Sequence, residues 1–303
     1  MSATPDEIQA GEAAGRHDES RPQPAYQELI YEVEDPVATV TLNRPERLNA
    51  LTGRLLSEIG HAFERAENDQ RVVGIVLTGA GRGFSAGADM ENLSSAAEGG
   101  GDGAGRALPE LLASSPGDPE MGPDFDVTYG YFLKLRKPIL AAINGPCAGL
   151  GFVLAMLSDL RFVSDRAVFT TAFANRGLVA EHGVSWILPR LIGPSKALDI
   201  LWSGRRFDAL EADRLGLVNR LVPHDELLPA ARAYIRELAE RSSPTSLRLM
   251  KQQVYKHLME RLGPSMVESN EMMARSLQAE DFREGVRSYL EKRSPRFPRV
   301  GSE

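Results

Sequence analysis

The chain has 303 residues, a length that fits one large α/β domain or two domains of roughly 150 residues each. It is 42% hydrophobic and 25% charged, and 35 basic against 42 acidic residues give a net charge of -7. Its apolar runs are far shorter than the roughly 18 residues of a bilayer span, and no Lys/Arg block stands out. We therefore expect a soluble protein with a large core, no membrane segment and no nucleic-acid partner.

The cysteine content and the N-terminus indicate where the protein works. Cys147 is the single cysteine, so no intramolecular disulfide can form, and residues 1–25 lack the apolar stretch of a secretory signal. We therefore expect a cytoplasmic protein. The same 25 residues hold five acids and three prolines with almost no large apolar side chain, which predicts a disordered N-terminal extension.

The folded part is predicted to open with a hairpin and to continue as repeated strand-turn-helix units. Alternating and β-branched residues predict strands at 29–34 and 37–42. Thr52 is suited to cap a helix whose apolar residues recur at helical spacing up to Phe63. Further strands are predicted at 72–78, 139–143 and 160–163, with glycine-rich turns at 79–87 and 144–151 and an apolar helix through Met156. Such repetition is typical of stacked right-handed crossovers.

The middle and the end of the chain differ from this pattern. Residues 90–127 are rich in Gly, Ser, Pro and Asp, and a loop this long inside a compact domain is usually functional or disordered. After Pro194 helices are expected at 195–203, 209–215, 226–240, 245–258 and 281–292. We therefore divide the chain into the extension, a core of residues 26–193 and a helical C-terminal region of residues 194–303.

Several chemical motifs are weak or absent. Gly83-Phe-Ser-Ala-Gly87 matches the G-x-S-x-G pattern of serine hydrolases, which makes Ser85 a remote candidate nucleophile. The strand that should lead directly into this serine ends several residues earlier, however. No complete G-x-G-x-x-G and no P-loop occur. The five histidines lie far apart in the sequence, so we expect no metal site.

Two glycine-dense turns, within residues 84–89 and 141–152, are more informative when they are considered together. Each follows a predicted strand and leads toward a helix, a geometry that leaves backbone N–H groups unpaired and directs a helix dipole at the turn. Two such turns could form one pocket with two N–H donors. Either turn alone is explained as well by glycines that merely permit a tight bend.

Five ordered motifs resemble those of the crotonase family, the enoyl-CoA hydratases and isomerases, over roughly residues 26–297. They are the segment Leu42–Leu51, the Ser-Ala-Gly-Ala-Asp turn, the Asn-Gly-Pro-Cys-Ala-Gly-Leu-Gly turn, Leu160-Arg-Phe-Val163 with Phe169, and Glu280–Val286 with Glu291-Lys-Arg293. The resemblance implies an α/β fold, a crotonase-like spiral of repeated ββα units with a helical C-terminal region that trimerises. It also implies a CoA thioester as the ligand.

The resemblance assigns the backbone N–H groups of Ala88 and Leu150 to the thioester oxygen. Hydration of a 2-enoyl thioester and migration of its double bond both pass through an enolate, whose charge such donors stabilise by about 2.7 to 4 kcal/mol each. Because these donors are main-chain groups, Leu at position 150, where the family commonly has Gly, need not remove one. Asp89, Asn49 and Asn144 are expected to fix the surrounding turns.

The resemblance also suggests how the CoA moiety is held. Arg47 and Lys292 match family positions near the phosphates, and Ala86 and Met90 flank the expected adenine pocket. A lone basic residue is more often a solvated surface group, so each assignment is weak by itself. We expect no separate cofactor, because CoA enters as part of the substrate.

The acid/base residues depart from the hydratase pattern of the family. Two glutamates serve hydratases, and the matching positions here carry Val153 and Phe173, neither of which can transfer a proton. If the helix is followed onward from Phe173, Glu181 occurs where several isomerases and the dehalogenase branch place a single catalytic carboxylate. One carboxylate suits a shuttle that takes a proton from one carbon and returns it to another, so we favour isomerisation over hydration.

Alternatives to this prediction stay open at the level of the sequence. Apolar neighbours, expected to be Leu178, Val179 and Trp186, should make Glu181 a stronger base, but Glu181 could equally be a surface glutamate or an acid at a helix N-terminus. The protein could also be a hydratase that uses a non-standard acid, or a non-catalytic acyl-CoA-binding member. The family resemblance and the amphipathic helices after Pro194 predict a homotrimer or a hexamer.

Overall fold

The folded part of the chain opens with the two strands that the sequence predicts. A computed structural model describes residues 25–89, 94 and 112–300, so the predicted N-terminal extension lies, except for Ala25, outside the described residues. β1 (Leu29–Glu34) and β2 (Val37–Leu42) pair in antiparallel register. The strands β3 (Gly74–Gly79), β4 (Ile139–Ile143), β6 (Leu160–Ser164) and β9 (Arg220–Val222) follow in parallel, giving a sheet of order β1-β2-β3-β4-β6-β9.

Three short strands form a second sheet beside the first. These strands are β5 (Cys147–Ala148), β7 (Val168–Thr170) and β8 (Phe207–Asp208). β5 follows β4 and β7 follows β6 along the chain, so the backbone visits the two sheets alternately as it winds. The predicted α/β architecture, a spiral of repeated strand-strand-helix units, is confirmed.

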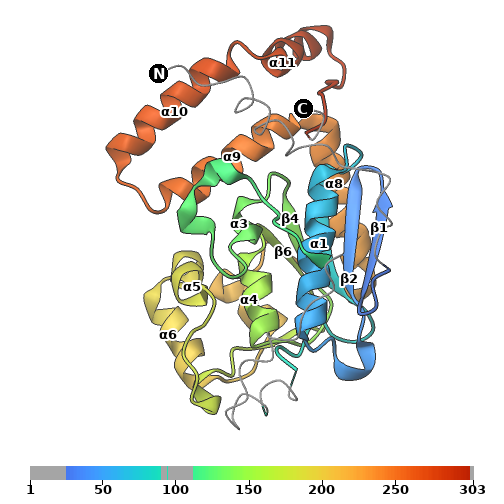
Figure 1. The fold of residues 1–303 in the computed structure, drawn as a ribbon, viewed down its shortest axis with the longest axis vertical. Helices are drawn as coiled ribbons and strands as arrows, with labels where there is room; N and C mark the ends of the chain where they lie inside the picture. Colours follow the sequence, from blue (N-terminus) through green and yellow to red (C-terminus); the bar gives the residue numbers. More distant parts are fainter. Residues whose placement is uncertain (1–24, 90–93, 95–111, 301–303) are drawn as a thin grey trace, which may run out of the picture.

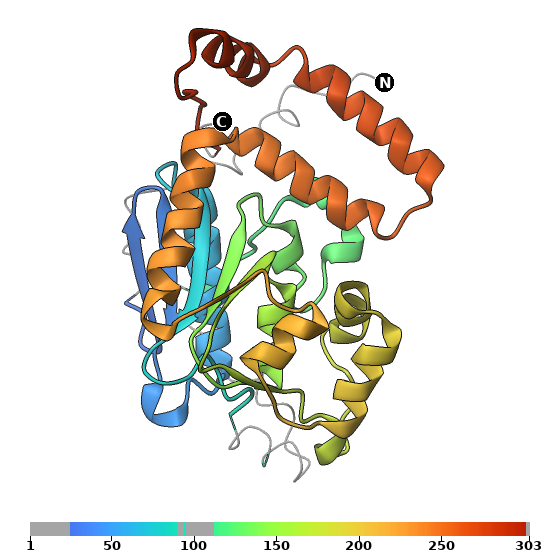
Figure 2. The same ribbon diagram turned by 180° about the vertical axis from the view of Figure 1, so that it is seen from behind.

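Helices cover the main sheet on both faces. α1 (Gly53–Asn68) and α4 (Leu150–Leu157) lie on one face, and α8 (Leu227–Arg241) lies on the other (Figures 1 and 2). α1 begins where Thr52 Oγ1 accepts a hydrogen bond from Leu55 N at 3.0 Å, as its capping pattern predicts. α4 is buried along its whole length, which agrees with its uniformly apolar sequence.

The other helices are α3 (Tyr131–Lys134), α5 (Val184–Ile192), α6 (Pro194–Ser203), α7 (Ala209–Leu215), α9 (Pro244–His257), α10 (Leu262–Ser276) and α11 (Glu280–Glu291). Those from Pro194 onward follow the predicted C-terminal pattern, except for α10, whereas α3 and α5 lie outside that pattern. α10 was not predicted, because Gly263 and Pro264 in its first turn read as a break and its apolar side chains are largely exposed. Beyond Pro194, β8 and β9 still join the sheets, and the division of the chain at residue 193 stays a prediction.

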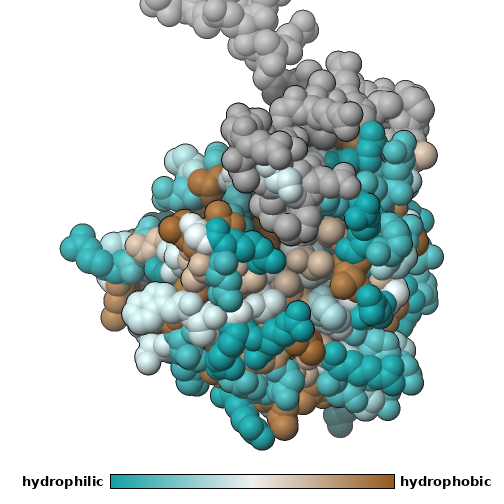
Figure 3. All heavy atoms as spheres, turned by 90° about the horizontal axis from the view of Figure 1, so that it is seen from below, coloured by the Kyte–Doolittle hydropathy of each residue, from teal (hydrophilic) through white to brown (hydrophobic). Residues whose placement is uncertain are grey.

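The carboxyl ends of the parallel strands open at the lower side of the molecule in Figure 1. Three loops start there, after Leu42, Gly79 and Ile143, the last residues of β2, β3 and β4. Seen from this side, hydrophobic and hydrophilic side chains are intermixed on the described surface (Figure 3). In open α/β sheets this edge is where ligands usually bind.

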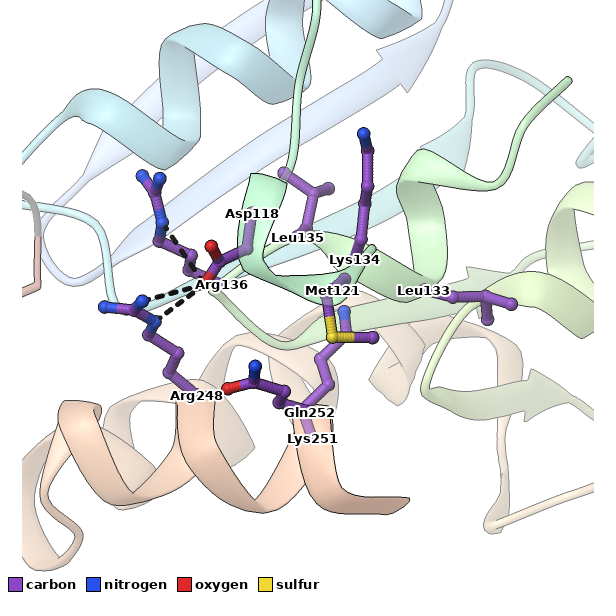
Figure 4. A pocket seen from close by; sticks show the side chains of 9 residues that line it. All are labelled: Asp118, Met121, Leu133, Lys134, Leu135, Arg136, Arg248, Lys251 and Gln252. Carbon is purple, nitrogen blue, oxygen red and sulfur yellow. Dashed lines mark hydrogen bonds and ion pairs between the residues drawn. The ribbon is translucent and has the colours of Figure 1, made fainter. Parts of the chain in front are cut away.

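A polar junction attaches α9 to the core. Buried Asp118 accepts a hydrogen bond from Arg248 Nε at 2.9 Å and lies 3.7 Å from Arg136 Nε (Figure 4). Lys251, also on α9, donates to Asp159 Oδ2 at 2.7 Å. Each charge in this junction has an opposite partner, so the junction holds a helix in place and is no candidate for the active site.

Candidate active site

The two glycine-dense turns lie side by side at the lower edge of the sheet. Ser85 and Cys147 form an isolated parallel bridge, in which Ala148 N donates to Ser85 O at 2.9 Å. Three residues further along the two turns stand Ala88 and Leu150. The structure therefore brings together the two turns that were predicted to share one pocket.

Local geometry leaves the N–H groups of both predicted donors unpaired. Leu51 N donates to Gly87 O at 2.8 Å and Asp89 N donates to Leu51 O at 3.0 Å, a parallel pattern that turns the N–H of Ala88 to the other side. Leu150 is the first residue of α4, where a helix has no internal acceptor for the N–H group. Over residues 25–89 and 112–300, neither N–H meets an acceptor.

Gly87 makes the close approach of the two turns possible. Its φ is +94°, in the region that favours glycine, and a Cβ at this position would lie 2.8 Å from Ala148 O and 3.3 Å from Leu150 N. A side chain at position 87 would therefore push directly against the second turn. The glycine is needed both for its conformation and for its lack of a side chain.

Two buried amides fix these turns, as predicted. Asn49 Nδ2 donates to Gly83 O at 2.8 Å, and Asn49 Oδ1 accepts from Arg44 N at 2.9 Å. Asn144 Nδ2 donates to Gly79 O at 2.9 Å. Asn49 and Asn144 therefore tie backbone groups of separate loops together, which holds the two N–H donors in a rigid frame.

Ser85 is a structural residue. Its side chain is fully buried, its Oγ donates to Asn49 O at 2.8 Å, and it accepts from Gly87 N at 3.2 Å. No histidine contacts it within the part of the chain that the structure describes. A nucleophile must be exposed and paired with a base, so the serine hydrolase alternative is wrong.

The two positions at which hydratases of this type carry glutamates belong to the hydrophobic core. Val153 is fully buried in α4, and Phe173 is 3% exposed. Phe173 comes soon after β7, whose Thr170 pairs with Ala148 of the second turn. These side chains pack beside the proposed pocket and supply no acid or base.

Glu181 lies in an irregular segment, and the helix expected to run from Phe173 to Ser185 is wrong. A short 3-10 turn, η6 (Ala174–Arg176), ends at Gly177, and His182 and Gly183 have φ values of +50° and +81°, which no α-helix can contain. α5 begins only at Val184 and packs against α4. Glu181 therefore sits in the turn that leads into a helix next to α4.

The surroundings of Glu181 differ from the expected apolar enclosure. Val179 is 79% exposed and Leu178 is 42% exposed, so they do not cover the carboxylate in a single chain. The Glu181 side chain itself is one-third exposed, and its Oε2 lies 3.7 Å from His182 Nε2. The carboxylate is partly exposed to solvent and lies close to an imidazole.

Tyr129 is a neighbour of this pair that sequence reasoning missed. Its ring meets the His182 ring edge-on with the centroids 5.0 Å apart. Burial, together with the negative charge of Glu181, raises the pKa of Tyr129 to about 12. Tyr129 comes shortly after the loop predicted at 90–127 and carries no periodic signal in the sequence, so only the fold reveals its place.

The residues expected at the CoA end fall into two groups. Arg47 ends the 3-10 turn η2 (Pro45–Arg47), and the exposed Ala86 donates its N–H to Leu48 O of the next loop at 2.8 Å. Met90 lies outside the described residues. Lys292 follows α11 at the top of Figure 1, whereas the loop between β2 and α1 lies at the bottom, so one chain does not bring Lys292 to Arg47.

Non-glycine residues with left-handed backbone conformations concentrate around these positions. Among the described residues they are Leu48, Asn49, Tyr129, Ala172, His182 and Lys292. Lys292 is a predicted site residue, Leu48 and His182 adjoin one in sequence, Asn49 fixes the turns, and Tyr129 contacts His182. Such conformations cost about 1–2 kcal/mol each and gather where function requires a particular geometry.

Comparison with known proteins identifies the family that the chain resembles. Residues 32–299 match the family model Enoyl-CoA hydratase/isomerase. The chain is 36% identical over 282 residues to a probable enoyl-CoA hydratase of Mycobacterium tuberculosis (strain ATCC 25618 / H37Rv), covering 89% of this chain and 92% of that protein. It is 31% identical over 274 residues to the 1,2-epoxyphenylacetyl-CoA isomerase of Escherichia coli (strain K12), covering 89% of this chain and 97% of that protein.

A solved structure gives the same result. The crystal structure of a probable enoyl-CoA hydratase/isomerase from Mycobacterium abscessus matches with a TM-score of 0.75 at 30% identity, covering 89% of this chain and 98% of that one. The chain belongs to the enoyl-CoA hydratase/isomerase family, and its predicted crotonase-like fold is confirmed.

Two further searches concern metals and membranes. Across the described ranges, no three His, Cys, Asp or Glu side chains come together as a metal site. None of the helices in those same ranges is both long and apolar enough to cross a bilayer.

Proposed function

We propose that the protein processes acyl-CoA thioesters and moves a carbon-carbon double bond along the acyl chain. Ala88 N–H and Leu150 N–H would bind the thioester oxygen and stabilise the enolate. The observation that supports this role most strongly is that two unpaired N–H groups stand on adjacent, rigidly held turns. No resident cofactor is needed, because CoA enters with the substrate.

Glu181 would carry the proton in this reaction. It takes a proton from the carbon next to the thioester of a 3-enoyl substrate, which gives a dienolate held by the two N–H groups. The same carboxyl group then returns the proton at the far end of the conjugated system, and a 2-enoyl thioester results. One accessible carboxylate is sufficient for this cycle, and Val153 and Phe173 supply no second one.

Two other readings compete with isomerisation. A hydratase would need a second acid in place of the missing glutamates. The similarity to probable enoyl-CoA hydratases supports this alternative. A non-catalytic acyl-CoA binder would need only the N–H pair and the CoA contacts. A partly exposed Glu181 carboxylate close to an imidazole favours a catalytic protein over a simple binder.

Mass and ultraviolet absorbance on a panel of 2-enoyl, 3-enoyl and dienoyl CoA thioesters separate these readings. Isomerisation changes only the absorbance, hydration adds the mass of water, and a binder changes neither. We expect Glu181→Gln to lower turnover of the best substrate by about 10² to 10⁴, with CoA-ester binding nearly unchanged, because the amide keeps the shape but cannot take a proton.

Glu32→Gln is the matched control, since Glu32 is an exposed glutamate on the edge strand β1. It should leave turnover at the wild-type level. Turnover of Glu181→Gln close to that of the wild type would show that the carboxylate is structural and would end the isomerase proposal.

A further inference from the structure

The turn before α3 and the turn before α5 meet at one cluster of three proton-bearing side chains, Tyr129, Glu181 and His182. Tyr129 and His182 are 53 positions apart along the chain, yet their rings lie edge-on with the centroids 5.0 Å apart. The His182 imidazole in turn lies 3.7 Å from the Glu181 carboxylate. The imidazole therefore touches the phenol ring and also lies close to the carboxylate.

The turn before α3 and the turn before α5 both have unusual backbone conformations at this contact. Tyr129 has a φ of +60° and His182 a φ of +50°, and neither is a residue that favours this region as glycine does. Gly183 follows with a φ of +81°, so the chain reverses sharply directly after the imidazole. These conformations cost free energy, and they occur at the two residues whose rings touch. Strained backbone of this kind is expected where a particular geometry is needed for function.

We propose that His182 is a positioning residue for Glu181 and that the Tyr129 ring holds the imidazole in place. An imidazole held 3.7 Å from one carboxylate oxygen restricts the rotamers open to the Glu181 side chain and leaves the other oxygen to exchange the proton. A flexible, one-third exposed glutamate would otherwise sample many rotamers, and a misplaced base loses rate steeply. This inference rests on the proposed role of Glu181 as the proton carrier.

A double-mutant cycle tests the inference in the full-length protein, with the best CoA thioester from the panel as substrate. His182→Asn is the informative variant, because Asn tolerates a left-handed backbone and so keeps the turn while removing the ring. We expect kcat to fall by about 10-fold to 100-fold, with KM within about threefold of the wild type. In the Glu181→Gln background the same substitution should cost less than about twofold, because no base remains to be positioned.

Matched variants separate positioning from general damage. His257 and Glu268 form a second His–Glu contact, with Nε2 and Oε2 3.0 Å apart on α9 and α10, and His257→Asn should keep kcat within about twofold. Tyr129→Phe retains the ring and should stay within about threefold, whereas Tyr129→Leu should lose about tenfold. Circular dichroism and melting temperature are measured for every variant, and His182→Gly replaces His182→Asn if the latter does not fold.

The outcomes for this inference and for the proposed function are distinct. An inactive Glu181→Gln combined with a wild-type kcat for His182→Asn overturns the positioning role alone. Equal losses from His182→Asn in the wild-type and Glu181→Gln backgrounds would overturn it too, since His182 would then act independently of the carboxylate. Full activity of Glu181→Gln instead removes the proposed function and, with it, this inference.

Discussion

At the scale of single residues, Gly87 is a position at which the two turns of the site leave no room for a side chain. We predict that Gly87→Ala lowers turnover by at least about 10², because its Cβ would press on Ala148 O and displace Leu150 N from the thioester oxygen. The variant should also lose about 1–2 kcal/mol of unfolding free energy through its left-handed backbone. Steady-state kinetics and urea unfolding measure the two effects.

Gly122→Ala is the control for that experiment. Gly122 has a φ of +87°, close to that of Gly87, but a Cβ there would meet nothing within 4 Å. It should lose stability through its backbone conformation alone, with turnover near the wild-type level. If both alanine variants lose turnover equally, close packing at Gly87 has no special role in the site.

Some residue roles could be predicted from the sequence and others could not. Asn49 and Asn144 were expected to fix turns, because amides beside glycine-rich turns have few other uses. Their hydrogen bonds confirm this prediction. Tyr129 could not be predicted, since its contact with His182 joins two irregular segments and depends only on tertiary structure. The roles of Ala88, Leu150 and Glu181 stay predictions that the measurements above decide.

At the scale of elements, a buried ammonium closes the C-terminal end of α1. Lys137 Nζ donates to Ala66 O at 2.9 Å and to Asp69 O at 2.7 Å, carbonyls that the helix leaves unpaired. Burial lowers the pKa of Lys137 from 10.5 to about 8. The group thus satisfies the helix end while remaining costly to charge.

This pKa predicts a pH-dependent difference in stability between the wild type and Lys137→Met. From about pH 8 to 10.5 the unfolded chain keeps a proton that the folded protein has released, so the unfolding free energy of the wild type should rise relative to the variant. The full rise would be at most about 3 kcal/mol, and none is expected below about pH 7. Urea unfolding at several pH values measures it, and a difference that does not vary with pH would contradict the assignment. Titration of the tyrosines cancels between the two proteins.

Element prediction succeeded where a sequence pattern was long and failed where tertiary contacts decide. The β1–β2 hairpin, α1 and α4 follow from alternation, capping and apolar runs. The strands β7 and β8 are too short to show a pattern and exist only because each pairs with a neighbour. The helix predicted from Phe173 onward was wrong. The composition of this segment allows a helix, but the left-handed conformations of Gly177 and His182 prevent it.

At the scale of the whole molecule, the C-terminal helices present large apolar side chains that are exposed within the described part of the chain. α10 and α11 lie apart from the sheet, at the end that Figures 1 and 2 show uppermost. Their exposed apolar residues are Leu262, Met266, Val267, Met273, Leu277, Phe282, Val286, Tyr289 and Leu290. Tyr289 is 83% exposed and Leu290 is 73% exposed, which is unusual for large apolar groups on a helix.

We predict that these faces are buried in a homotrimer or in a hexamer built from two trimers. Light scattering at micromolar concentration should give a mass of about three or six times the 33.1 kDa chain. Replacing Tyr289 and Leu290 together by lysine should shift the mass toward the monomer, because charges would have to enter an apolar interface. A monomeric wild type would contradict the prediction, and with it the idea that Lys292 reaches a neighbour's CoA.

The left-handed non-glycine residues around the site carry a consequence for the evolution of this protein. The left-handed positions other than Lys292, each held at about 1–2 kcal/mol above a relaxed backbone, lower the stability that the rest of the fold provides. Evolutionary substitution of Leu48 or Ala172 by glycine would remove the backbone strain at that position and favour heat resistance. The same substitution would loosen the turns beside the reacting group, so a heat-adapted relative would have to find its extra stability elsewhere, for example by covering the apolar faces of α10 and α11 more tightly.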